Sequence, residues 1–286
     1  MLRKASSWVS SPLAVHLLLG AAGASGPSID KYAQLSKLLA KDERNTLRSR
    51  VFIASSSEEQ RKYGDLESQH VDFRNDADSN TISDWINQHA EETMGFKNDF
   101  PMDTRIALTN IHRFKDTWKE FNNGSPCMKL YNSFNYTQDV KYETRMLELP
   151  TSGDFKLVLL VPNETDVLPE LFSKLRNEGL EAAASCLQPM FTTTTRLEAP
   201  SISICSKIIR EQEIVTKSFT ATGLQYGNIK ISDEGIDINV LTCLYSTVDS
   251  APIKKEEDMS FLEKRPCFFI ALIFKDTPIF LGQYYP

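Results

Sequence analysis

Histidine and cysteine, the side chains best suited to nucleophilic catalysis and metal binding, are scattered along the chain. The four histidines are His16, His70, His89 and His112, and the five cysteines are Cys127, Cys186, Cys205, Cys243 and Cys267. They form no C-x-x-C pair and no H-E-x-x-H run, and the chain has neither a G-x-S-x-G nor a G-x-x-x-x-G-K-[ST] motif. The sequence therefore predicts no catalytic residue, no metal site and no cofactor, and an enzyme is the less favoured class.

We expect the helices and strands of residues 1–286 to form a single domain, which would position any functional residue. Of these 286 residues 41% are hydrophobic, and no Pro- or Ser-rich linker divides them, so one large core is possible. The net charge is −6 and no basic run is interleaved with aromatic residues, which disfavours a nucleic-acid partner. No stretch reaches the roughly 18 apolar residues of a membrane span, so we expect no membrane partner.

The amino terminus leaves the compartment open. Residues 1–4 are basic and residues 12–24 are mostly apolar, as in a signal peptide that would make the protein secreted. The alternative is a core helix of the mature protein, because Ser11-Pro12 is a typical helix start and His16 interrupts the apolar run. An odd number of widely spaced cysteines favours a reducing compartment, with each cysteine a small buried apolar residue.

Periodicity predicts an α+β fold with a large sheet. The predicted helices begin at Pro12, Ile29, Ser79 and Leu168 and end at the glycine-rich run 20–26, Leu47, Met94 and Leu180. His89 belongs to the apolar face of the third helix. The clearest predicted strands are Arg50–Ala54, Ile106–Ile111, Phe268–Phe274, Ile279–Leu281 and the hairpin of Met146–Leu149 with Lys156–Val161. Most of the chain after Thr192 reads as strand.

Several short motifs, in a fixed order from Ser11 to Pro286, resemble those of the serpin family. The first are Ser11-Pro12-Leu13 with Gly20-Ala21-Ala22-Gly23, then Val71-Asp72-Phe73, then Ile82-Ser83-Asp84-Trp85-Ile86. The most specific is Leu108-Thr109-Asn110-Ile111 followed by Phe114-Lys115-Asp116-Thr117-Trp118, which is similar to L-V-N-A and F-K-G-x-W. Glu148-Leu149-Pro150, Asp233-Glu234-Gly235, Arg265-Pro266-Cys267 and Ile279-Phe280-Leu281-Gly282 resemble later motifs.

The resemblance implies a serpin-like fold, reduced by several deletions. Material is missing before Ser11 and in the segments 29–51, 121–146 and 192–233. The first two losses resemble small poxvirus serpins, and the later two fall where the second and third sheets would be. The family's sheet-opening region corresponds here to Ser11, Asn110 and Trp118, and Ala14 stands where a second Ser is common.

The resemblance also implies a function, that of a protease inhibitor whose cleaved loop inserts as a new central strand. The reactive-loop region is about residues 233–260, and its hinge is Asp233, Glu234, Gly235 and Ile236. From Ile236 to Thr242 the side chains alternate as an inserted strand requires. The bulky residues after Gly235 differ from the small ones of inhibitory serpins, so a permanent strand in a non-inhibitory binding protein is the alternative.

The hinge spacing predicts a reactive bond between Asp249 and Ser250, with Ser246, Thr247 and Val248 as the recognition residues. An Asp at this position suits proteases with an Arg-lined pocket, such as caspases and the Asp-cutting granule serine protease. Counting back from Arg265 instead gives Lys254 or Lys255, which suits a trypsin-like enzyme. The expected partner is a host protease, and the expected protein is a viral, monomeric inhibitor in the host cytoplasm.

Overall fold

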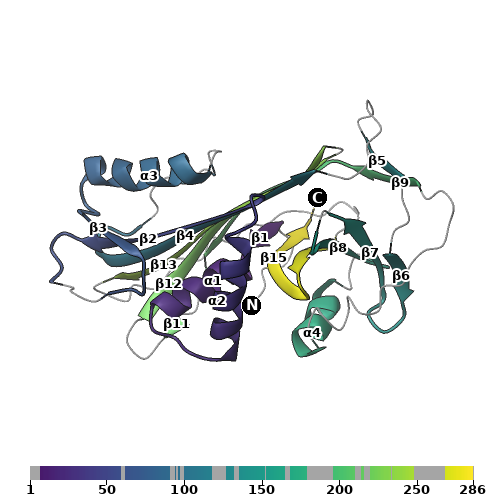
Figure 1. The fold of residues 1–286 in the computed structure, drawn as a ribbon, viewed down its shortest axis with the longest axis horizontal. Coiled ribbons are helices and arrows are strands. Elements are labelled where there is room, and N and C mark those ends of the chain that lie inside the picture. The colour runs from purple at the N-terminus through teal and green to yellow at the C-terminus, as the bar shows by residue number, and fades with distance from the viewer. Residues whose placement is uncertain are drawn as a thin grey trace.

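A long seven-stranded sheet runs through most of the molecule (Figure 1). Its strand order is β10-β12-β13-β4-β2-β3, with the short β11 paired to β12, and every pair is antiparallel except β2 with β3. The strands are β2 (Asn45–Ala54), β3 (Glu67–Val71), β4 (Thr104–Thr117), β10 (Ile202–Ile209), β11 (Ile214–Val215), β12 (Thr220–Ile231) and β13 (Gly235–Thr247).

This computed structural model describes most of the chain. The residues outside the description are 1–6, 59–61, 91–93, 95, 97–99, 118–126, 132–134, 152, 165–167, 179–195, 210–213, 216–219, 233, 248–267 and 286. The predicted site residues Trp118, Asp233, Val248, Asp249 and Ser250 therefore lie outside the described residues, as do Lys254 and Lys255.

Two smaller sheets complete the strand-rich part of the described chain. A six-stranded sheet has the order β1-β15-β14-β8-β7-β6, and a two-stranded sheet consists of β5 and β9. The strands are β1 (Trp8–Ser10), β5 (Cys127–Tyr131), β6 (Asn135–Asp139), β7 (Thr144–Pro150), β8 (Phe155–Pro162), β9 (Arg196–Pro200), β14 (Phe268–Phe274) and β15 (Thr277–Tyr284). The predicted hairpin is confirmed, because β7 and β8 pair from Thr144 to Pro162.

Four helices are described, α1 (Pro12–Ala21), α2 (Pro27–Leu39), α3 (Asp76–Ala90) and α4 (Leu168–Glu178). The helix start at Ser11-Pro12 is confirmed, and the Ser11 hydroxyl accepts a hydrogen bond from the amide of Ala14 at 3.1 Å. The helix predicted to extend to Leu47 is wrong at its carboxyl end. It stops at Leu39, and residues 45–47 pair with β4 instead. The Arg44 guanidinium, which binds the carboxylate of Asp42 at 2.6 Å, stabilises the turn between helix and strand.

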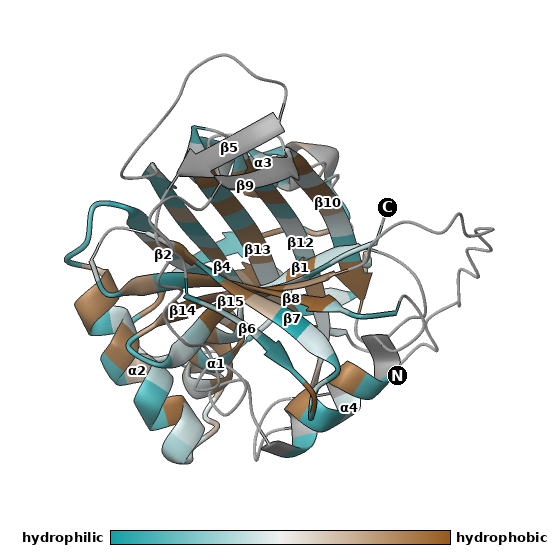
Figure 2. Cartoon of the chain, turned by 90° about the vertical axis from the view of Figure 1, so that its right-hand side faces the viewer, coloured by the Kyte–Doolittle hydropathy of each residue, from teal (hydrophilic) through white to brown (hydrophobic). Residues whose placement is uncertain are grey.

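The two faces of the seven-stranded sheet are buried by different partners. One face is covered by α3 (Figure 1). Its residues Ile82, Trp85 and Ile86 belong to the same buried cluster as Phe52 and Leu241 of the sheet. His89 lies beside Trp85 with its Nδ1 2.7 Å from the Trp85 carbonyl oxygen, so its predicted place on the helix face is confirmed. The other face forms a core with the six-stranded sheet and the helices α1 and α2. Hydrophobic bands cross the strands of the seven-stranded and the six-stranded sheet (Figure 2).

Candidate functional site

The segment from Gly235 to Thr247, which holds the last two predicted hinge residues and the predicted insertion segment, forms β13, a central strand of the seven-stranded sheet. It pairs with β4 from Gly235 to Thr247 and with β12 from Ile236 to Tyr245. Both pairings are antiparallel, so β4 and β12 run parallel to each other on either side of β13. Withdrawal of β13 would leave two parallel strands facing each other, and β13 fills the space between them.

Gly235 marks the sharp entry into β13. Its φ of +151° is a conformation that side-chain-bearing residues rarely adopt. A Cβ at this position would lie 2.1 Å from the carbonyl oxygen of Asp116 on β4, so the residue must also be small. The turn before it is held by the Ser232 amide, which donates to the Gly235 carbonyl at 3.0 Å, and Glu234 is exposed. Glycine is thus required at position 235 for two independent reasons, its φ and the lack of space for a Cβ.

The side chains of β13 alternate between two buried environments. Ile236, Ile238 and Val240 are at most 2% exposed and belong to the core between the two large sheets. Leu241 and Cys243 point to the other face and pack under α3. The Asn239 amide on that face donates to the carbonyl of Ala90 at the end of α3. The predicted alternation is confirmed, but the expected outward side is largely covered by α3 rather than exposed to solvent.

Asp237 is the charged residue of this strand, and it has a specific partner. The guanidinium of Arg113 on β4 donates to its carboxylate from Nε at 3.3 Å and from Nη2 at 3.0 Å. Both side chains are partly buried, with 12% of Arg113 and 23% of Asp237 exposed. A two-pronged contact of this kind is the strongest form of ion pair, and it links β13 to β4 near the hinge.

A buried polar cluster lies where α1 meets the underside of the sheet. The Ser11 hydroxyl, which caps α1, is 2.8 Å from Nδ1 of His112 on β4. The His112 ring stacks on Phe280 with the ring centroids 4.0 Å apart. Burial lowers the pKa of His112 from 6.5 to about 3, because the charged ring would lose its hydration there. His112 is therefore neutral at physiological pH.

A second polar chain bridges β12 and β13. The Gln225 amide donates to the Thr242 hydroxyl at 2.9 Å, and its oxygen accepts from the Ser10 hydroxyl at 2.7 Å. On β4, two residues from His112, the Asn110 amide donates to the hydroxyl of Ser49 at 2.7 Å. Ser11 therefore contacts β4 on the face that carries both His112 and Asn110. Ser11 binds His112, whereas Asn110 binds Ser49.

Sequence reasoning missed three members of these clusters, His112, Gln225 and Thr242. Each stands within a strand. His112 and Gln225 have partners far away in the sequence, Ser11 and Ser10, and Thr242 is bound by Gln225 on the neighbouring strand. The available signal was a polar residue at a position that alternation assigns to the core.

Of the predicted recognition residues, Ser246 and Thr247 are half-buried at the end of β13 and pair with Ile106 and Thr104.

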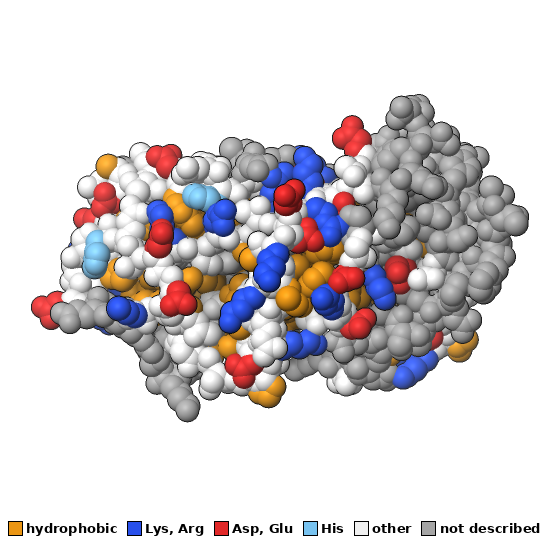
Figure 3. Space-filling view, viewed as in Figure 1, with side chains coloured by type: hydrophobic (Ala, Val, Ile, Leu, Met, Phe, Trp, Pro, Cys, Tyr) orange, Lys and Arg blue, Asp and Glu red, His pale blue; other side chains and the backbone are white. Residues whose placement is uncertain are grey.

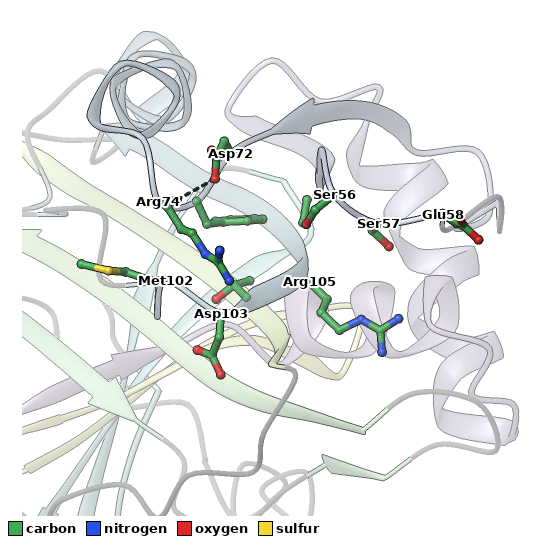
Figure 4. Close-up of a pocket in the computed structure, with 11 residues that line it drawn as sticks. Ser56, Ser57, Glu58, Asp72, Arg74, Met102, Asp103 and Arg105 are labelled. Atoms are coloured by element: carbon green, nitrogen blue, oxygen red, sulfur yellow. Dashed lines mark hydrogen bonds between the residues drawn. The ribbon is translucent and has the colours of Figure 1, made fainter.

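A cavity of about 310 Å³ lies beside the end of β4 that pairs with Thr247 (Figure 4). Its walls come from the end of β2, the loop between β3 and α3, and the start of β4. They are Ala54, Ser56, Ser57, Glu58, Asp72, Phe73, Arg74, Met102, Asp103, Thr104 and Arg105. The lining carries charges of both signs and includes neither histidine nor cysteine.

Cys205 and Cys243 are both free, but their environments differ. Cys243 is buried as predicted, whereas the prediction is wrong for Cys205, which is exposed on β10. The side chains of β10 alternate between the core and the open side of the sheet, and Cys205 lies on the open side.

Among the described helices none is long and apolar enough to cross a membrane.

Comparisons with known proteins agree with this topology. The family model described as Serpin (serine protease inhibitor) matches residues 52–214. Human Serpin B4 is 24% identical over 270 residues, covering 78% of this chain and 68% of that protein. Human Serpin B3 is 27% identical over 179 residues, covering 54% of this chain and 45% of that protein.

Solved structures share the fold at low sequence identity. Cleaved Serpin 42Da matches with a TM-score of 0.76 and 19% identity, covering 99% of this chain and 91% of that chain. Tengpin, a thermophilic serpin in the latent state, matches with a TM-score of 0.74 and 13% identity, covering 99% and 93%. With the family model matching more than half of its residues and the whole described fold superposing on serpin structures, this chain belongs to the serpin family.

Proposed function

We propose that this chain is a serpin-type protease inhibitor that is cleaved between Asp249 and Ser250. The observation that carries the proposal is the position of β13 between β4 and β12, two strands that are parallel to each other. A strand that fills such a space can enter or leave without reversing its neighbours. In the proposal, the described arrangement is the end state of inhibition, in which the segment after the hinge has entered the sheet.

The proposed targets are host proteases that cut after Asp, either caspases or a granule serine protease. The assignment of Asp249 starts from the hinge, and the required glycine at position 235 supports that starting point. A carboxylate at the cleavage position needs a pocket with charge-assisted donors, which restricts the class of enzyme. We further propose a viral, monomeric protein acting in the host cytoplasm, with secretion as the alternative if residues 1–25 act as a signal peptide.

Incubation with a caspase, an Asp-cutting serine protease and trypsin tests this proposal. Products are separated on a denaturing gel, and the cut is located by mass spectrometry. We expect a complex that survives denaturation with one of the Asp-specific enzymes, and a carboxyl-terminal fragment that begins at Ser250. Asp249→Ala should abolish this product, while the matched double variant Lys254→Ala/Lys255→Ala should leave it unchanged. Cleavage after Lys254 or Lys255 alone would instead support a trypsin-like target.

A second candidate function is that of a non-inhibitory serpin that acts as a binding partner. It is favoured by the bulky side chains of Ile236, Ile238 and Val240, which must be threaded between two strands before they are buried. Slow entry gives a protease time to complete hydrolysis and leave. In this case the same gel would show a clean cut after Asp249 without a stable complex, or no cut at all.

A further inference from the structure

Arg44 differs from most charged residues of this chain, because its guanidinium is largely enclosed by the fold. On the face of the molecule that carries α1 and α2, the described acidic and basic side chains are interspersed, so the surface charge there has no single sign (Figure 3). The Arg44 side chain is only 24% exposed. Its role is therefore to be sought in the contacts that it makes within the protein.

Three segments of the fold meet at the Arg44 guanidinium, at the end of the seven-stranded sheet that carries Gly235. Nη2 lies 2.6 Å from the carboxylate of Asp42 in the turn before β2, and Nη1 lies 3.2 Å from the carboxylate of Asp116 on β4. The guanidinium carbon is 4.6 Å from the centre of the Phe155 ring at the start of β8. One cation therefore joins strands of two different sheets to the turn between α2 and β2.

These contacts extend the attachment of β4 beyond its regular pairing with β2. That pairing begins at Asn45, which lies opposite Phe114. One residue further along β4, the Lys115 amide donates to the Arg44 carbonyl at 3.0 Å, and the ion pair with Asp116 follows. The ends of strands are the parts of a sheet that open most readily, so this attachment restrains the end of β4.

Asp116 is also the residue against which Gly235 packs. In the register of the two strands Gly235 lies opposite Thr117, and Ile236 lies opposite Asp116. A Cβ at Gly235 would be 2.1 Å from the Asp116 carbonyl oxygen. The carboxylate held by Arg44 and the carbonyl that faces Gly235 thus belong to one residue. Asp116 takes the place of the glycine in the F-K-G-x-W pattern, so its side chain makes this anchor available to this chain.

We propose that Arg44 is a positioning residue for the entry of β13, because through Asp116 it holds the end of β4 in the place where Gly235 enters the sheet. The inference rests on the proposed function, in which the segment after Gly235 enters between β4 and β12. None of the Arg44 contacts described above involves β13, so they do not require β13 to be in the sheet. An edge that is already ordered lowers the entropic cost of entry, which matters when a bulky residue such as Ile236 must be threaded while hydrolysis competes.

A double-variant experiment tests this role without a target protease. It uses the full-length protein in whichever form, intact or cut in its loop, melts at the higher temperature, or the intact form if the two melt alike. We expect Gly235→Ala to lower the guanidinium chloride midpoint about twice as far in the wild type as in Arg44→Gln, because a released Asp116 gives way to the added Cβ. Gly26→Ala, whose added Cβ has nothing within 4 Å, should lower the midpoint equally in both backgrounds.

Two results of this experiment would overturn the proposal. Equal effects of Gly235→Ala in both backgrounds would mean that Arg44 does not fix the Asp116 carbonyl. A smaller effect of Gly26→Ala in Arg44→Gln as well would mean that the variant loosens the whole fold. If Arg44→Gln does not fold, Asp116→Asn, which keeps the shape of the side chain, replaces it.

Hydrogen exchange followed by mass spectrometry gives the second measurement, which does not need Gly235→Ala to fold. In Arg44→Gln the segment 235–240 should exchange roughly tenfold faster than in the wild type, and the segment 241–247 should be unchanged. The matched control is Arg50→Gln, which removes another arginine ion pair of β2, that with Glu67 at 2.9 Å, and should leave the segment 235–240 unchanged. Equal exchange of this segment in Arg44→Gln and the wild type would contradict the proposal.

The link to inhibition is measured separately with an Asp-specific protease. Arg44→Gln should be cut at the wild-type rate, because the loop itself is unchanged, but a severalfold smaller fraction should remain as a stable complex. An unchanged fraction of complex would refute the role in β13 entry. If the wild type forms no complex, the proposed function fails, while the midpoint and exchange measurements still decide whether Arg44 positions the end of β4.

Discussion

The Ser11 hydroxyl and Nδ1 of His112 share a hydrogen bond of 2.8 Å, and both residues are fully buried. One caps α1 and the other is in the middle of β4, so this single contact joins the helix to the sheet strand next to β13. The neutral His112 ring is also stacked on Phe280 of the six-stranded sheet. The neutral imidazole of His112 on β4 therefore contacts both the start of α1 and the six-stranded sheet.

The burial of His112 predicts a loss of stability in mild acid. Its pKa is about 3 in the folded protein and near 6.5 when unfolded, so the unfolded chain binds a proton first as the pH falls. The free energy of unfolding should therefore decrease by about 1 kcal/mol per pH unit between pH 6.5 and 3 from this group alone. Urea unfolding at pH 7 and pH 4.5 measures the change.

His112→Leu should be less stable at pH 7 but should show a smaller decrease between these two pH values. The control His70→Gln removes an exposed histidine and should keep the wild-type slope. The carboxylate of Asp42 does not account for the change in the free energy of unfolding between pH 7 and pH 4.5. Its pKa is lowered by the hydrogen bonds from Arg44, so its contribution is lost only below its ordinary value of 3.8. Equal slopes in wild type and His112→Leu would refute the assignment.

Gly235 can be tested against another glycine with nearly the same φ. Gly235 has a φ of +151° and Gly26 a φ of +149°, but an added Cβ meets the Asp116 carbonyl at position 235 and nothing within 4 Å at position 26. Gly26→Ala should cost about 1–3 kcal/mol of stability from backbone strain alone. Gly235→Ala should cost clearly more, because β13 must also move away from β4. Equal costs in denaturant unfolding would argue against the close approach.

Local sequence signals predicted much of the fold, and contacts between distant residues account for the misses. Ser11-Pro12 is a self-contained helix start, and the apolar runs of β8 and β14 allow few alternatives. The sequence places the end of α2 too late, because Leu47 lies eight residues after Leu39, which is also a helical spacing. There, pairing with β4 determines the conformation, and the pairing partner lies more than 60 residues away. Tertiary contacts override local periodicity in such segments.

The candidate site was predicted unevenly for the same reason. The hinge assignment rests on the resemblance of Asp233-Glu234-Gly235 to a family motif and stays a prediction. The alternation after Gly235 is a local pattern, and β13 (Gly235–Thr247) confirms it. The polar contacts that hold β13 and its neighbours could not be placed. Gln225 meets Thr242, and Arg113 meets Asp237 across 124 positions of sequence. Only the register of the sheet brings these residues together.

The ion pair of Arg113 and Asp237 should stabilise the sheet with β13 in place. Asp237→Asn removes the charge but keeps the shape, and should lower the free energy of unfolding by about 1 kcal/mol, because both groups are partly exposed. Glu67→Gln is the matched control, since Glu67 pairs with Arg50 at 2.9 Å but is 79% exposed. It should change the stability by less than about 0.5 kcal/mol. If Asp237→Asn lowers the free energy of unfolding by no more than Glu67→Gln does, the ion pair contributes little to stability.

The proposed inhibitor function predicts a difference in melting temperature between the intact and the cleaved protein. If freshly folded protein holds β13 outside the sheet, cleavage after Asp249 allows Ile236, Ile238 and Val240 to become buried as the structure describes. Each is worth roughly 1.5–3 kcal/mol. At a few °C per kcal/mol, the cleaved form should melt about 10 °C or more above the intact form.

Calorimetry of both forms checks this prediction, with Asp249→Ala exposed to the same protease as the control that stays uncut. The bulky strand residues affect how quickly β13 enters the sheet, but the final stability is a separate quantity, so a slow rise after cleavage still supports the proposal. Identical melting temperatures, reached from the first measurement, would mean that β13 is already in the sheet of the intact protein. The loop would then be only a substrate or a docking segment, which is the behaviour of the non-inhibitory candidate.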